Sequence, residues 1–177
     1  MKKFFIHTIL VLLAFIIYFL QSNFFSWFTI AGIKPNLFVI YVLFIGLFGN
    51  KSMGIIYGSV IGLFLDLIFK EKIGMNLFGL ALVGVIATIF NKNFSKDSRI
   101  TIMVMVLSST ALYEVFMYFI NYVVYSINVE ILKFMNILII EVIFNILITI
   151  IIYPLMQKFG YYIENEYKGN KILTRYF

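Results

Sequence analysis

The sequence predicts an all-α integral membrane protein, built as a six-helix transmembrane bundle. Of its 177 residues, 63% are hydrophobic and 12% are charged, which is more apolar surface than a soluble domain of this size can bury. The charged residues are separated by long apolar runs, close to the roughly 20 helical residues that cross a hydrocarbon core about 30 Å thick. These runs are apolar on all sides, whereas a transmembrane β-strand alternates apolar and polar residues.

Charged and turn-forming residues divide the chain into six expected spans within a single transmembrane domain, followed by a cytoplasmic tail over 157–177. The spans are predicted at approximately 4–21, 35–49, 53–69, 73–90, 100–125 and 131–156. The span at 35–49 is short for a full crossing, so it is either a tilted helix in a thinned bilayer or part of a re-entrant pair with the next span. Pro154 is predicted to kink or end the last helix.

Lysine and arginine predict the orientation through the positive-inside rule. With the N-terminus in the cytoplasm, the outer side carries only Lys34, Lys70, Lys72 and Lys133. The inner side carries the other ten basic residues, Lys2, Lys3, Lys51, Lys92, Lys96, Arg99, Lys158, Lys168, Lys171 and Arg175. Both termini are therefore expected in the cytoplasm. Because the net charge of +6 lies in short loops and at the termini, it indicates topology, and no nucleic-acid partner is expected.

Several kinds of chemistry have no support in the sequence. There is no cysteine and a single histidine, His7, so disulfides, thiol catalysis and histidine-rich metal sites are excluded. The chain contains no phosphate-binding loop, no HExxH metal motif and no Gly-x-Ser-x-Gly nucleophile motif. We therefore expect neither an enzyme nor a cofactor.

Gly54, Gly58, Gly62 and Asp66 are spaced four residues apart on the third span, so they lie on nearly one helix face. Such a glycine stripe lets another helix approach closely in lipid. Two interpretations are open, packing inside the bundle and a groove for a helix of another protein. Asp66, close to Asn76 at the start of the fourth span, is interpreted as part of a polar cluster that fixes the connecting loop, in preference to an ion site.

Two polar stripes mark the last two spans. Glu114 and Asn121 belong to the fifth span, and Glu141 and Asn145 belong to the sixth. Thr110, Tyr118, Tyr125 and Thr149 extend these stripes. Because unpaired charge is costly inside a membrane, both stripes are expected to face the bundle interior and to hold the two helices together. A proton relay or a small-ligand site is the functional alternative.

An ordered set of short motifs resembles the MreD family of bacterial rod shape-determining membrane proteins. The motifs follow the family's order and cover essentially the whole chain. Asn36 stands where the family more often has Asp, and the family's Pro before Leu-Gly-x-Asn is missing. The motifs are Lys34-Pro35-Asn36-Leu37, Gly49-Asn50-Lys51, the stretch from Gly54 to Asp66, Ile73-Gly74-Met75-Asn76, Asn145 and Tyr153-Pro154-Leu155.

This resemblance implies a non-enzymatic scaffold or regulator of the cell-wall elongation machinery in the bacterial cytoplasmic membrane. The implied partners are an MreC-like protein, the RodA/transpeptidase pair and the actin-like MreB, with the groove of Gly54, Gly58 and Gly62 as a candidate contact for MreC. The resemblance also suggests a fold like the S components of energy-coupling-factor transporters. The alternative function is therefore an S-component-like subunit whose ligand pocket is lined by Glu114, Asn121, Glu141 and Asn145. For the scaffold, no small-molecule ligand is expected.

Overall fold

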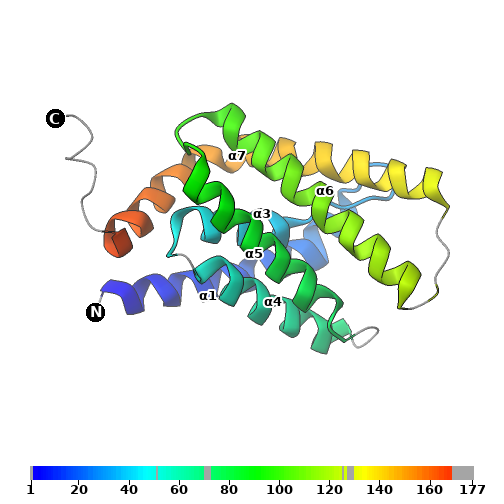
Figure 1. Cartoon of the computed structure of the whole chain (residues 1–177), viewed down its shortest axis with the longest axis horizontal. Helices are drawn as coiled ribbons and strands as arrows, with labels where there is room; N and C mark the ends of the chain where they lie inside the picture. The colour runs from blue at the N-terminus through cyan, green and yellow to red at the C-terminus, as the bar shows by residue number, and fades with distance from the viewer. Residues whose placement is uncertain (1, 51, 70–72, 125, 127–129, 169–177) are drawn as a thin grey trace.

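The computed structural model describes residues 2–50, 52–69, 73–124, 126 and 130–168. This part of the chain is almost entirely helical and contains no named strand; Ile30 and Ile33 form an isolated bridge in the loop before α3. The prediction of an all-α membrane fold is confirmed. The helices are α1 (Lys2–Phe19), the π-helical turn η1 (Leu20–Phe24), α2 (Phe25–Trp27), α3 (Leu37–Phe48), α4 (Met53–Phe69), α5 (Met75–Asn93), α6 (Arg99–Val123) and α7 (Ile131–Lys168). Figure 1 shows them gathered into one elongated bundle.

By length and composition, four helical stretches can cross a bilayer, which makes the chain a multi-pass membrane protein. They are Lys2–Trp27, Met75–Asn93, Arg99–Val123 and Ile131–Tyr167. The apolar helices at Leu37–Phe48 and Met53–Ile68 are shorter. The bundle therefore combines long helices with two short ones, and the short ones determine where polar groups must be satisfied inside the protein.

Helix α3 lies at the centre of the bundle. All 12 of its residues are buried, and it contacts α1, α4, α5, α6 and α7. At 1.5 Å per residue it is about 18 Å long, well short of a hydrocarbon core of about 30 Å. Its unpaired terminal N–H and C=O groups must therefore find partners inside the protein, because lipid offers none.

Helix α7 does not end at Pro154 but continues as one helix to Lys168. Packing explains why the proline does not stop it. Beyond the proline, Ile163 is 1% exposed, and Gly160 lies so close to the Phe48 ring that an added Cβ would come within 2.5 Å of its Cγ. This C-terminal arm of α7, residues 157–168, covers the end of α3, and that burial offsets the hydrogen bond that proline removes.

The beginning of α1 and the end of α7 lie side by side at one end of the bundle (Figure 1). Lys2 Nζ donates to Glu166 Oε1 at 3.2 Å. His7 forms contacts with two tyrosine hydroxyls, Tyr57 at 2.7 Å and Tyr167 at 2.8 Å. The first and last described residues are thus on the same side of the molecule.

Candidate functional site

The glycine face of α4 is filled by α5 from the same chain. A Cβ added at Gly58 would stand 2.8 Å from the carbonyl carbon of Leu80, and one added at Gly62 would stand 2.5 Å from the Cα of Leu77. At Gly54 the added atom would be 2.7 Å from the Cα of Gly46 on α3. These are backbone-to-backbone approaches that only glycine permits, so this face leaves no room for a helix from outside.

Asp66 continues the glycine face and satisfies the first N–H groups of α5. Its carboxylate accepts from the backbone of Gly74 at 2.9 Å, Asn76 at 3.1 Å and Leu77 at 3.1 Å, and from Asn76 Nδ2 at 2.9 Å. Gly74 is the N-cap of α5 and has no side chain to perform this role. Because the positive end of the helix dipole favours a negative group, a buried carboxylate, here 2% exposed, is well stabilised at this position.

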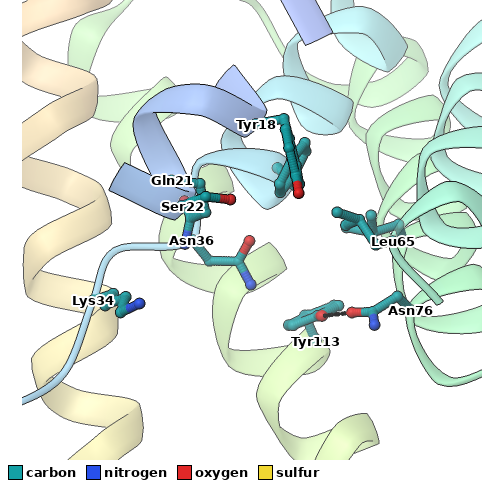
Figure 2. A pocket seen from close by; sticks show the side chains of 10 residues that line it. Tyr18, Gln21, Ser22, Lys34, Asn36, Leu65, Asn76 and Tyr113 are labelled. Carbon is teal, nitrogen blue, oxygen red and sulfur yellow. Dashed lines mark hydrogen bonds between the residues drawn. The ribbon is translucent and has the colours of Figure 1, made fainter. Parts of the chain in front are cut away.

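Asn76 connects this cap to α6, since its Oδ1 accepts from the Tyr113 hydroxyl at 3.1 Å (Figure 2). The Tyr113 side chain is 4% exposed, and its ring contacts Gly79 on α5, where an added Cβ would come within 2.8 Å. The start of α5 is therefore held by α4 on one side and by α6 on the other.

The start of α3 is satisfied by amide side chains from distant parts of the chain. The N–H of Asn36 donates to Asn145 Oδ1 at 2.8 Å, and the N–H of Leu37 donates to Gln21 Oε1 at 3.1 Å. Asn36 also caps its own helix, accepting from Val39 at 3.3 Å. On the far side, Asn145 Nδ2 donates to Thr110 Oγ1 at 3.0 Å and so joins α7 to α6. Asn36, which stands where the family more often has Asp, takes part in two of these bonds, to Asn145 and from Val39.

The two glutamates predicted to face the bundle interior lie against each other. The side chains of Glu114 and Glu141 are close enough to interact, and Glu141 also lies next to the side chain of Asn36. The residue Glu141 is 7% exposed, and its Oε1 is buried without a hydrogen-bond partner.

Asn121, the remaining predicted member of these stripes, donates to the Met117 carbonyl of its own helix at 2.8 Å. Tyr118 packs against Phe134 of α7 with the two rings tilted, their centroids 4.4 Å apart. Thr149 donates to the carbonyl of Asn145 at 2.7 Å. Tyr125 lies outside the described residues.

Lys96 is a polar centre that sequence reasoning treated only as a topology signal. It is 9% exposed, and its Nζ donates to Glu164 Oε2 at 2.8 Å, Asn91 Oδ1 at 3.1 Å and the Leu47 carbonyl at 2.9 Å. The last of these bonds places a cation at the negative end of α3. No spacing rule could have paired Lys96 with Glu164, because 68 residues separate them.

A cavity of ≈ 290 Å³ borders the polar groups at the start of α3 and α5 (Figure 2). Its polar lining comes from Tyr18, Gln21, Ser22, Lys34, Asn36, Asn76 and Tyr113, and its apolar lining from Phe38, Leu65 and Leu80. These residues differ from the Glu114, Asn121, Glu141 and Asn145 set expected to line a ligand pocket. Among the described residues, no three His, Cys, Asp or Glu side chains are grouped as metal ligands.

The geometry defines a class: a multi-pass α-helical membrane protein with a closely packed glycine seam and a buried polar cluster where two helices begin. A family model described as rod shape-determining protein MreD matches residues 2–162. The chain therefore belongs to the MreD family, and the resemblance seen in its motifs is confirmed. No curated protein and no solved structure matches the chain.

Proposed function

We propose that the chain is a non-enzymatic scaffold of the cell-wall elongation machinery in the bacterial cytoplasmic membrane. The observation that carries this proposal is the MreD family match over residues 2–162, which implies a role in rod shape determination. The partners we propose are an MreC-like protein, the RodA/transpeptidase pair and MreB. A chain made almost entirely of membrane helices suits a protein that acts by holding others together.

We place both termini in the cytoplasm. Support comes from the ends of the described chain, which share one side of the bundle, and from the charges around them. That side carries Lys2, Lys3, Lys92, Lys96, Arg99 and Lys158, whereas the described basic residues at the opposite side are Lys34 and Lys133. An excess of Lys and Arg is typical of the cytoplasmic side.

For the helix of an MreC-like partner, we propose the exposed face of α1 in place of the glycine face that α5 occupies. In the most apolar 18 residues of the stretch Lys2–Trp27, only 11% of the residues are buried in the bundle. The corresponding shares for the other three long stretches are 39%, 33% and 22%. Within α1, only Ile6 and Leu10 are buried, whereas Leu12 is 57% exposed and Ile16 is 53% exposed. This helix has the most surface left for a neighbour in the membrane.

Two measurements test the proposal in the bacterium that encodes the chain. Depletion should round or widen the cells and disperse the incorporation of labelled wall precursor. Photo-crosslinking residues placed at Leu12 and Ile16 should capture the MreC-like protein, whereas one at Val104, which is 55% exposed on α6, serves as the matched control. Unchanged shape and wall incorporation after depletion would refute the scaffold, and capture only from Val104 would refute the α1 contact.

A further inference from the structure

We propose that the cavity between η1, the segment before α3, the start of α5 and the middle of α6 binds a small anionic group, a phosphate or a carboxylate. The lining of the cavity and its volume support this inference. It does not depend on the scaffold role, because no proposed partner contact involves these residues.

The lining combines one cation with several neutral hydrogen-bond donors. Figure 2 shows the Tyr18 hydroxyl and the Asn36 side chain directed into the space, with Lys34 at its edge. Lys34 is the charged residue in the lining, and its ammonium has donors beyond the one that reaches Ser26 Oγ at 2.9 Å. Asp66, the nearest acid on α4, is absent from the lining, because its oxygens are directed at the start of α5.

The two helices that begin at the cavity differ in how their positive ends are compensated. The start of α5 faces the carboxylate of Asp66. The start of α3 is bonded by neutral amides, those of Gln21, Asn36 and Asn145. Glu141 lies next to the Asn36 side chain but is not part of the lining, so the charge on the α3 side of the cavity is that of Lys34, and it favours a negative ligand.

The size of the cavity supports a ligand over a packing defect. Since a water molecule takes about 30 Å³, a cavity of ≈ 290 Å³ holds about ten waters or a compact head group.

Two sources share this chemistry. The cavity lies near η1 and α2, where Trp27 is 88% exposed and matches the aromatic residues found at membrane head groups. A lipid head group can therefore approach from the membrane, and a free phosphate or carboxylate can approach from water. The experiment must separate these two routes.

The test measures thermal unfolding of the purified full chain with two kinds of probe. Glycerol 3-phosphate and succinate probe the soluble source, in phosphatidylcholine nanodiscs. Nanodiscs of phosphatidylglycerol, compared with phosphatidylcholine alone, probe the lipid source. A ligand that binds only the folded state raises the unfolding temperature. We expect a rise with at least one anionic probe, and the probe that produces it identifies the source.

Two variants and a matched control locate the effect. Lys34→Gln removes a charge-assisted contact, so it should raise the probe concentration needed for a given rise in unfolding temperature at least roughly tenfold. Tyr18→Phe should raise this concentration by less. Lys133→Gln removes an exposed cation at the same end of the bundle and should leave the response unchanged. No rise with any probe, or an equal loss in the Lys34 and Lys133 variants, would overturn the proposal.

Discussion

At the scale of single residues, buried polar side chains in this protein serve the ends of helices. Asp66 accepts hydrogen bonds from the first N–H groups of α5, and Asn36 accepts one from the first turn of α3. Lys96 donates a hydrogen bond to the Leu47 carbonyl at the end of α3. In water, solvent could satisfy the same groups, but within a bilayer each unsatisfied group costs several kcal/mol. These side chains therefore satisfy backbone groups that lipid would leave unpaired.

Replacing Asp66 by Asn should lower the free energy of unfolding by about 2–3 kcal/mol, because several charge-assisted bonds to the start of α5 are lost together. Unfolding in detergent with increasing denaturant measures this change. Glu130→Gln is the control, since Glu130 is 74% exposed in its ion pair with Lys133. Equal stability of the two variants would contradict the role given to Asp66.

At the scale of elements, the α4–α5 seam and the two ends of short α3 determine the arrangement. Glycines bring the backbones of α4 and α5 together, and van der Waals contact at this distance is a principal source of helix association in lipid. The C-terminal arm of α7 then covers the end of α3 through Glu164, Phe159 and Gly160. Each short helix is thus fixed by a neighbour that the local sequence does not specify.

Gly58→Leu should prevent α4 and α5 from packing, because its Cβ would meet the Leu80 backbone, which cannot move aside as a side chain could. We expect loss of the folded monomer in detergent size-exclusion chromatography and rapid degradation in cells. Val60→Leu, on the same helix at a position 61% exposed, should behave like the parent chain. A stable, well-folded Gly58→Leu protein would contradict the close packing of α4 against α5.

The pair formed by Lys96 and Glu164 should be worth far more than the exposed pair formed by Lys2 and Glu166. Lys96→Met should cost about 2 kcal/mol or more, because the Leu47 carbonyl and Glu164 lose a charged donor. Lys2→Gln should change stability by less than about 0.5 kcal/mol, since Lys2 is 74% exposed in its ion pair. A double-mutant cycle with Glu164→Gln isolates the coupling, and a coupling near zero would refute it.

At the scale of the whole molecule, the structure is a bundle with two chemically different ends. Basic loops and the C-terminal arm of α7 lie at one end, and the cavity with Lys34 lies toward the other. The first and last helices meet through Lys2, His7, Glu166 and Tyr167, so the chain returns to the side on which it began. The orientation we propose follows from this closure together with the charge asymmetry.

Because the chain has no cysteine, single cysteines can report orientation without background. With the proposed topology, an impermeant maleimide added to intact cells or spheroplasts should label Lys34→Cys and Lys133→Cys. Lys3→Cys and Ser98→Cys should react only after the membrane is opened. All four positions are exposed in the structure, so protection reflects the side of the membrane. The reverse labelling pattern would invert the proposed orientation.

The sequence by itself determined the class and the family of this protein. Apolar runs of membrane-crossing length are a local property, since hydrocarbon selects for composition over about 20 consecutive residues. The glycine spacing of α4 is equally local, because residues four apart share a helix face whatever surrounds them. The motif order that indicated the MreD family also depends only on position along the chain.

Only the tertiary structure decided which groups meet. The bond from Asn36 to Asn145 spans 109 positions, and nothing in the spacing of either residue specifies the other. Likewise, the partner of the glycine face is α5, and α7 runs through Pro154 because its C-terminal arm buries residues against α3. Such choices depend on the packing of several helices at once, and the free energy of that packing is not carried by any one segment.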